Sequence, residues 1–336
     1  MDEIQKNIEL LKEIVVPSKR TVILTHDNPD PDAIAASLGF KSFLKEQFGQ
    51  ESIISFGGIV GRAENQSMIQ HLKISMTPVD QIRFQDYPLI VLIDTQPNTG
   101  NNSLPDTLVP DIVIDHHPLR EETKQVPFFD VREKAGSCSG MITSYLREAG
   151  ISIQPRLATA LYYGIKSDTN DLGRNADALD AESYLFLFPK VQRDILNRIV
   201  HPKVSAEYFK ILNRAFKKAR IHGSSLITSI GRTRNPDMVA EVADMLLRHE
   251  GVEWVLVMGI FRKAMILSVR TSDMRGGAGD LVQSMVRGMG KAGGHGMMAG
   301  GKIDVKNGTT QELEEILQER FLKKIGDINQ PVEALV

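Results

Sequence analysis

Short apolar runs rich in β-branched residues recur through the first half of the chain, each bounded by turn residues. They cover residues 21–25, 52–56, 89–93 and 111–114. Their length and composition predict strands that are buried on both faces. Apolar residues at helical spacing fill the stretches between them, at residues 2–16, 32–47, 63–73, 139–149 and 154–168. This alternation predicts an α/β fold, a doubly wound and mostly parallel sheet with helices on both faces.

The pattern changes after about residue 190. Residues 191–220 predict one or two helices with many basic side chains, and further strands are expected at 225–230, 253–261 and 264–270. The last two strands predict a hairpin, and a helix over about 279–289 precedes a glycine-rich segment. We therefore predict a first domain over 1–195, a helical linker over 196–222 and a smaller α/β domain over 223–336.

Composition narrows the class of protein. The 336 residues are 42% hydrophobic and 24% charged, which is typical of a globular protein with two domains. A net charge of −2 argues against binding long duplex nucleic acid by overall charge. Apolar runs stay well short of the roughly 20 residues that cross a bilayer, and the acidic N-terminal stretch lacks the order of a signal peptide. We expect a cytoplasmic protein without membrane contact, and the single cysteine, Cys138, allows no internal disulfide.

Carboxylates and imidazoles follow three of the predicted strands. The residues concerned are His26, Asp30 and Asp32 after the first strand, Asp94 after the third, and Asp115, His116 and His117 after the fourth. The carboxyl ends of parallel strands meet at one edge of a sheet, where ligands bind. Alone, the Asp-Pro-Asp turn is typical of a helix cap. Together, so many acids and imidazoles indicate a site that holds cations, and the simplest interpretation is a two-metal hydrolytic site.

The type and spacing of these side chains also suggest which metal binds. Asp94 stands alone at a strand end, so its two oxygens are suited to bridge two ions roughly 3.5–4 Å apart. His116 would supply nitrogen to the second ion. Mixed oxygen and imidazole donors favour Mn²⁺, with Mg²⁺, Co²⁺ and Fe²⁺ as alternatives.

A second group of candidate residues lies near the C-terminus. Residues 292–301 contain five glycines around His295, and glycines let backbone amides approach an anion closely. Arg270 ends an apolar strand, where a guanidinium can grip phosphate. An ordinary glycine-rich turn with an incidental histidine explains the same pattern. The basic stretch 203–220 could likewise follow a nucleic-acid backbone or be a solvated helix face, and Cys138 is interpreted as a small packing residue.

The sequence resembles the DHH phosphoesterases in several motifs. Asp115-His116-His117 matches their name-giving signature, HDNPDPDAIAAS resembles their first motif, Asp94 their second, and Asp168 in GIKSDTNDLG their fourth. AGGHGMMAGG and SVRTS (268–272) resemble the glycine-rich and arginine motifs of the DHH-associated substrate domain, with Ala292 in place of the usual first glycine.

The resemblance implies a role for each matching residue. His26, Asp30 and Asp94 would hold one metal ion. The second would be held by Asp32, Asp94, His116 and Asp168. Asp115 would orient the site and His117 would face the substrate phosphate. Arg270, Gly293, Gly294 and His295 would bind substrate. Only the resemblance selects Asp168, because its place after a predicted helix is equally typical of a cap.

The residues and the resemblance together predict two-metal hydrolysis of a phosphate ester, without a covalent enzyme intermediate. The expected substrates are short oligoribonucleotides, linear dinucleotides or 3′-phosphoadenosine 5′-phosphate, as in the nanoRNase and pAp-phosphatase subgroup. Alternatives are a pyrophosphate or polyphosphate hydrolase, a cyclic-dinucleotide phosphodiesterase, a processive exonuclease, and a non-catalytic nucleotide sensor. The sequence leaves the oligomeric state open, with a homodimer as one option.

Overall fold

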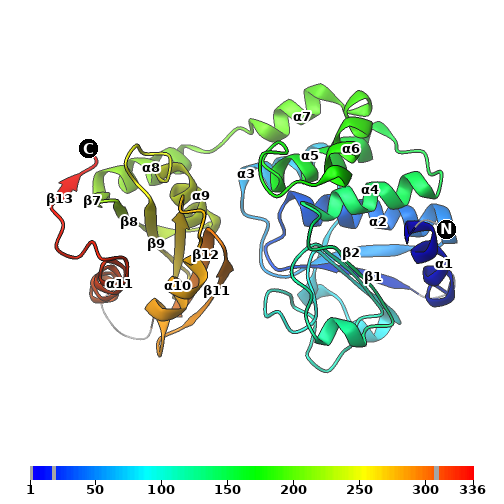
Figure 1. Cartoon of the computed structure of the whole chain (residues 1–336), viewed down its shortest axis with the longest axis horizontal. Helices are drawn as coiled ribbons and strands as arrows, with labels where there is room; N and C mark the ends of the chain where they lie inside the picture. The colour runs from blue at the N-terminus through cyan, green and yellow to red at the C-terminus, as the bar shows by residue number, and fades with distance from the viewer. Residues whose placement is uncertain (1–2, 17–19, 306–309) are drawn as a thin grey trace. The chain divides into compact units, whose positions relative to one another are not determined.

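A computed structural model describes residues 3–16, 20–305 and 310–336, with the side chain of His295 left out (Figure 1). The chain divides into two compact units, Met1–Pro202 and Lys203–Val336. The division falls inside the interval 196–222 that was predicted as a linker. Helix α7 (Arg193–Val200) belongs to the first unit and α8 (Ala206–Lys218) to the second.

The first unit is built on a six-stranded sheet whose pairings are parallel. Its order is β3 (Thr77–Pro78), β2 (Ser52–Phe56), β1 (Thr21–Thr25), β4 (Leu89–Ile93), β5 (Ile112–Asp115) and β6 (Phe128–Val131). The predicted parallel sheet is therefore confirmed, although β3 and β6 were not expected. The strand order reverses between the neighbours β1 and β4, which creates the crevice where such sheets bind ligands.

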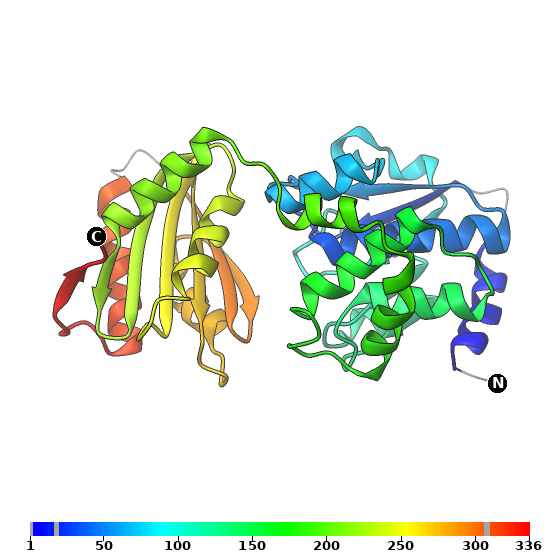
Figure 2. The ribbon, with the colours of Figure 1, turned by 90° about the horizontal axis from the view of Figure 1, so that it is seen from above.

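The α-helices of this unit share one core with one face of the sheet (Figure 2). They are α1 (Glu3–Ile14), α2 (Pro31–Phe48), α3 (Ala63–His71), α4 (Cys138–Glu148), α5 (Pro155–Asp168), α6 (Ala178–Leu187) and α7. Ile23, Val91 and Ile112 of the strands point into this core.

The opposite face of the sheet differs from the expectation of helices on both faces. Leu24, Leu92 and Val113 form a smaller core there, against the short 3₁₀ helices η1 (Val79–Gln81) and η2 (Phe84–Asp86) and neighbouring loops. The connection between β4 and β5, residues 94–111, contains three prolines and a glycine, which interrupt any helix. Asp94, the first residue of this connection, thus lies on irregular backbone that is anchored to strand β4.

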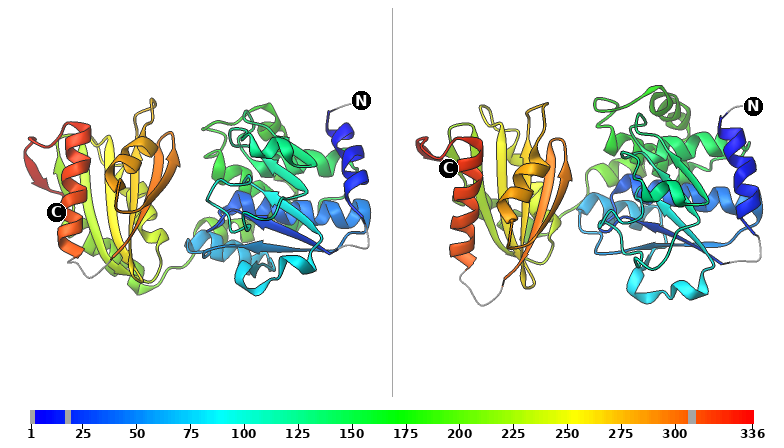
Figure 3. Two further views of the ribbon diagram at one scale, coloured as in Figure 1. Left: turned by 90° about the horizontal axis from the view of Figure 1, so that it is seen from below. Right: turned by 60° about the horizontal axis from the view of Figure 1, so that its bottom comes forward.

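The second unit has a seven-stranded sheet covered on both faces (Figure 3). Its order is β11 (Lys291–His295), β12 (Met298–Asp304), β10 (Ala264–Thr271), β9 (Trp254–Phe261), β8 (Ser225–Thr233), β7 (Arg220–His222) and β13 (Val332–Ala334). Helices α8 and α9 (Asp237–Leu246) cover one face, and α10 (Ala278–Val286) and α11 (Thr310–Ile325) the other. The predicted β9–β10 hairpin is confirmed. Among the described residues, none of the helices combines the length and apolar character that crossing a bilayer requires.

Candidate metal centre

The loop after β1 presents the first set of candidate ligands. Asp30 caps α2, accepting a hydrogen bond from the amide of Ala33 over 3.0 Å, and Pro31 opens the helix. The turn is therefore both the helix cap that its sequence suggests and a carrier of polar side chains. Its neighbour Asp27 accepts a hydrogen bond from Ser103 Oγ over 2.7 Å. A Cβ on Gly57 would lie 1.8 Å from the Asp27 carboxylate, so only glycine fits beside this loop.

Asp94 occupies the end of β4 in a left-handed backbone conformation with φ of 60°. Its backbone amide donates to the Ile114 carbonyl over 2.9 Å, which ties the end of β4 to β5. One carboxylate oxygen lies 3.6 Å from His26 Nε2 and the other lies 3.3 Å from His116 Nε2. A side chain that is 2% exposed thus stands between two imidazoles, which is the arrangement that a bridging ligand requires.

Asp168 and His116 meet on the other side of Asp94. The Asp168 carboxylate lies 3.2 Å from His116 Nε2, although Asp168 is the last residue of α5. His116 Nδ1 lies 3.1 Å from the Ala135 carbonyl oxygen, a contact that leaves Nε2 to face the carboxylates. Asp168 follows a helix, so its position becomes apparent only from the folded chain.

Asp32 is fully buried and belongs to the same group. Its two oxygens accept hydrogen bonds from the backbone amides of Cys138 and Ser139, at the start of α4, over 2.7 and 2.8 Å. A carboxylate offers about four acceptor sites, so these bonds leave capacity for a cation.

All six residues predicted to hold metal are therefore brought into one site. Ligand atoms of His26, Asp30 and Asp94 lie within 4.8 Å of one another, and so do those of Asp32, His116 and Asp168. These two clusters correspond to the two predicted ion positions, with Asp94 also grouping with His116 and His117. The donors are carboxylate oxygens and imidazole nitrogens, which fit a divalent cation such as Mn²⁺.

The pKa shifts of these acids and imidazoles also indicate a site for cations. Burial raises the pKa of Asp32 well above its ordinary value, and the charges of Asp94 and Asp168 add to the effect. Burial, with Asp30 nearby, also raises the pKa of Asp168 to about 7. Burial alone would lower the pKa of His26, but Asp30 and Asp94 raise it to about 10. The site thus concentrates negative charge that protons or cations must neutralise.

His117 and Asp115 form a pair beside this cluster. His117 Nδ1 lies 2.9 Å from Asp115 Oδ1. The same nitrogen lies 3.7 Å from Asp94 Oδ1. The His117 side chain is 37% exposed, compared with 14% for His116. The more open histidine is therefore the one predicted to face substrate, and Asp115 is in position to orient it.

The substrate-binding candidates of the second unit sit in a different setting from the one expected. Arg270 is buried in β10 and donates from Nε to Asp244 of α9 over 2.5 Å. Gly293 and Gly294 are part of strand β11, opposite Gly300 and Ala299 of β12, so the glycine-rich segment is a β-hairpin instead of a loop. A Cβ on Gly294, with φ of 138°, would lie 2.4 Å from Ala299 Cα. The backbone of His295 pairs with that of Met298, and Met298 also pairs with Arg270. The side chain of His295 lies outside the described part of the structure.

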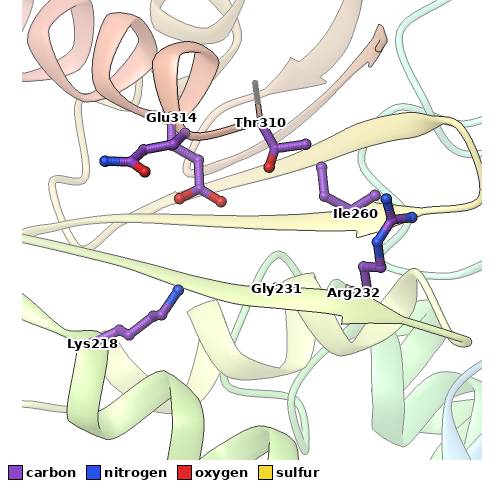
Figure 4. A pocket seen from close by; sticks show the side chains of 7 residues that line it. Lys218, Gly231, Arg232, Ile260, Thr310 and Glu314 are labelled. Carbon is purple, nitrogen blue, oxygen red and sulfur yellow. The ribbon is translucent and has the colours of Figure 1, made fainter. Parts of the chain in front are cut away.

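A separate pocket of about 460 Å³ lies in the second unit (Figure 4). Its lining brings together residues of α8, β8, β9 and the first turn of α11. They are Lys218, Gly231, Arg232, Ile260, Thr310, Gln311 and Glu314. Glu314 accepts a hydrogen bond from Ser229 Oγ over 2.5 Å, so the two basic side chains share the pocket with a carboxylate. The lining contains no histidine, and we give the pocket no part in metal chemistry.

Comparison with family models identifies both halves of the chain. The DHH family N-terminal domain matches residues 20–165 and the DHHA1 domain matches residues 223–324. The chain belongs to the DHH family. The metal-centre residues His26 to His117 fall within the DHH match, whereas Asp168 lies three residues beyond it.

Relatives of this DHH-family chain carry several descriptions. An uncharacterised protein of Methanocaldococcus jannaschii is 35% identical over 91% of this chain and 64% of its own length. A probable bifunctional oligoribonuclease and PAP phosphatase of Streptococcus mutans is 27% identical over 44% of this chain and 45% of its own. A probable manganese-dependent inorganic pyrophosphatase of Streptococcus agalactiae is 26% identical over 45% of this chain and 48% of its own. The chain thus spans about half to two thirds of the length of these relatives.

One solved structure shares the whole fold. The exopolyphosphatase-related protein from Bacteroides fragilis superposes with a TM-score of 0.76, covering 98% of this chain and 100% of its own, at 16% identity. The similarity shows that the α/β fold of this DHH-family chain recurs in that protein.

Two buried residues of the DHH domain were not predicted to serve the site. Cys138, expected as a packing residue, lies with its Sγ 3.6 Å from Asp94 Oδ1, and burial and Asp94 raise the pKa of the thiol well above its ordinary value. Its Sγ donates to Asp94 Oδ1, and it groups with Asp32 and Asp94 in the same site. Gln96 contacts Asp115 over 2.6 Å from a segment of mostly polar turn residues, and no local pattern distinguishes it.

Proposed function

We propose that this protein is a metal-dependent phosphoesterase that uses two divalent cations, most favourably Mn²⁺, to hydrolyse short nucleotide phosphate esters. The substrates are short oligoribonucleotides, linear dinucleotides or 3′-phosphoadenosine 5′-phosphate. The observation that carries the proposal is the Asp94 carboxylate, whose two oxygens face His26 and His116 at 3.6 and 3.3 Å. The descriptions of the Streptococcus mutans and Streptococcus agalactiae relatives support the reaction class and the metal.

The residues of the two clusters would divide between the ions. His26 and Asp30 would hold one ion and Asp32, His116 and Asp168 the other, with Asp94 shared. Bound divalent cations would lower the pKa of water and withdraw negative charge from the phosphoryl group.

Other side chains of the site would act on the substrate itself. His117 is the most exposed of the site's three histidines, so its imidazole can donate a hydrogen bond to a nonbridging phosphoryl oxygen. Asp115 would hold the ring at Nδ1 and stabilise its protonated form. The buried walls around Asp94 and Asp32 would exclude bulk water and strengthen these interactions.

Substrate length would be read by the DHHA1 domain. The β11–β12 hairpin carries glycines on both strands. No atom lies within 4 Å of the position that a Cβ on Gly293 would take, so a ligand could approach the backbone there closely. The glycine-rich and arginine motifs that resemble the DHH-associated substrate domain favour, in this proposal, nucleotide esters over inorganic pyrophosphate, the alternative that the manganese-dependent relative suggests.

A substrate panel with added Mn²⁺ tests the proposal. It compares pApA, RNA of two to five nucleotides, 3′-phosphoadenosine 5′-phosphate, pyrophosphate and cyclic dinucleotides on one protein preparation. We expect turnover of the first three classes. Preferential turnover of pyrophosphate or of cyclic dinucleotides would support those alternatives, and tight binding without turnover would indicate a nucleotide sensor.

Two further measurements use the same preparation. In competition assays we expect short nucleotides, and not long duplexes, to compete for the site. Light scattering decides between a monomer and a homodimer.

A further inference from the structure

Gln96 is a buried polar side chain beside the metal centre that makes hydrogen bonds at both ends of its amide. It is 1% exposed and lies two residues after Asp94, on the loop that leaves β4. Its amide nitrogen donates to Asp115 Oδ2 over 2.6 Å and to the Pro118 carbonyl over 3.1 Å. Its carbonyl oxygen accepts from the Arg120 amide over 2.9 Å and from Thr123 Oγ over 2.8 Å. A buried amide with this many partners has a single favourable position.

The partners also fix which end of the amide faces Asp115. Exchanging the oxygen and the nitrogen would set a carbonyl oxygen against the Asp115 carboxylate and an NH₂ group against the Arg120 N–H. Either contact would leave a buried polar group unsatisfied, which is unfavourable. The NH₂ group of Gln96 therefore points at Asp115.

Asp115 is held from two sides as a result. One of its oxygens receives the Gln96 amide and the other faces His117 Nδ1 at 2.9 Å. An aspartate that accepts from both neighbours keeps the ring proton of His117 on Nδ1 and turns the Nε2 edge away from Asp115.

We propose that Gln96 is a positioning residue that locks the Asp115 carboxylate and, through it, fixes the tautomer and orientation of His117. The relay runs from Gln96 through Asp115 to His117, whose Nδ1 lies closer to Asp115, at 2.9 Å, than to Asp94, at 3.7 Å. Its consequence for hydrolysis rests on the proposed function above, whereas the tautomer of His117 can be observed without any substrate.

The decisive variant is Gln96→Glu, which keeps shape and replaces the donor to Asp115 by an oxygen. Gln50→Glu is the matched control, because Gln50 is also 1% exposed and its amide donates to Thr21 Oγ at the opposite end of β1. Thr123→Val is a milder variant that removes one donor to Gln96 and leaves its amide on Asp115.

Two readouts separate positioning from general stability. The first is the ¹⁵N and ¹³C spectrum of the His117 ring in metal-free protein, recorded at a pH high enough for the ring to be neutral, where it distinguishes the Nδ1–H from the Nε2–H tautomer. The second is the kinetic constants with Mn²⁺ on a nucleotide ester. For Gln96→Glu we expect loss of the Nδ1–H signature and a kcat lowered about 10–100-fold, the usual effect of removing such a supporting partner. In Gln96→Glu we expect KM and the number of bound Mn²⁺ ions to stay unchanged. In both readouts Thr123→Val should fall between Gln96→Glu and the wild type, and Gln50→Glu should match the wild type.

The proposal is overturned if His117 keeps its Nδ1–H signature in Gln96→Glu, or if Gln50→Glu changes the spectrum equally. Loss of Mn²⁺ in Gln96→Glu would likewise overturn it, since the relay would then include the ion ligands. A wild type that hydrolyses no ester would defeat the proposed function, while the spectrum would still decide the role of Gln96.

Discussion

The carboxylate of Asp32 accepts a hydrogen bond from the backbone amide of Cys138 over 2.7 Å, so a residue at the start of α2 caps the start of α4. The two positions are 106 residues apart in the chain. Asp32 is also a candidate ligand, grouped with His116 and Asp168. One side chain thus couples the joining of two helices to the formation of the metal centre.

This coupling predicts different effects for two substitutions of Asp32. Asp32→Ala leaves two buried amides of α4 without acceptors, and we expect the metal-free protein to lose about 1–3 kcal/mol of unfolding free energy. Asp32→Asn keeps one acceptor and should lose less, while both variants bind fewer Mn²⁺ ions. Urea unfolding of metal-free protein, with Mn²⁺ titration in parallel, measures both effects. Equal stability of Asp32→Ala and wild type would contradict the capping role.

Asp94→Asn should separate metal binding from folding. Asparagine tolerates the left-handed backbone at this position, where φ is 60°, better than alanine does. The substitution removes the charge that the two clusters share, so we expect hydrolysis to fall by at least about 10²–10³-fold, the scale on which preorganised electrostatic groups act. Circular dichroism should stay as in wild type. Activity within about threefold of wild type would be incompatible with Asp94 as the bridge.

Arg270 has two roles to distinguish, its pair with Asp244 and a contact with substrate. Arg270→Gln and Asp244→Ala both remove the 2.5 Å pair and should each destabilise the second unit by about 1–3 kcal/mol. Only Arg270→Gln should also weaken turnover of short nucleotides relative to a small chromogenic phosphodiester. The test is the ratio of kcat/KM for the two substrates. Identical ratios in both variants would restrict Arg270 to a structural role.

His222 should give the second unit a pH-dependent stability. It is 5% exposed in β7, and burial lowers its pKa below 6.5, partly opposed by Asp327. Below its ordinary pKa the unfolded chain binds this proton more readily than the folded chain, so stability falls as pH drops below about 6.5. His222→Phe removes the titration and should lose less stability between about pH 7 and pH 5. Parallel slopes for the two proteins in urea unfolding would refute this.

The sequence was most informative where strands end. Because β1, β4 and β5 are short and apolar throughout, their ends could be located, and parallel pairing brings their ends together. The order of residues along the chain is therefore enough to place His26, Asp94 and His116 in one site. Asp168 could not be placed in this way, because a residue at the end of a helix points wherever the packing of that helix directs it.

Other features depend on contacts that no local pattern reports. A glycine-rich turn was the ordinary interpretation of segment 292–301, since glycine has low strand propensity, yet Gly294 lies in strand β11 opposite Ala299, where a Cβ would lie 2.4 Å from Ala299 Cα. Gln96 lies in a run of polar turn residues, and its partners follow 19 to 27 residues later. Within the described residues, 3₁₀ helices and loops cover the second face of the sheet, and the prolines of the β4–β5 connection interrupt any helix there.

The adjacency of β1 and β4 has a consequence for how the protein matures. These strands pair although 63 residues separate Thr25 from Leu89, and side chains beyond their ends contribute to both proposed ion positions. Closing so long a loop is slow compared with forming local helices. During synthesis, the residues of the candidate site would thus come together only after the two central strands have paired, so the nascent chain could bind a divalent cation there only at that stage.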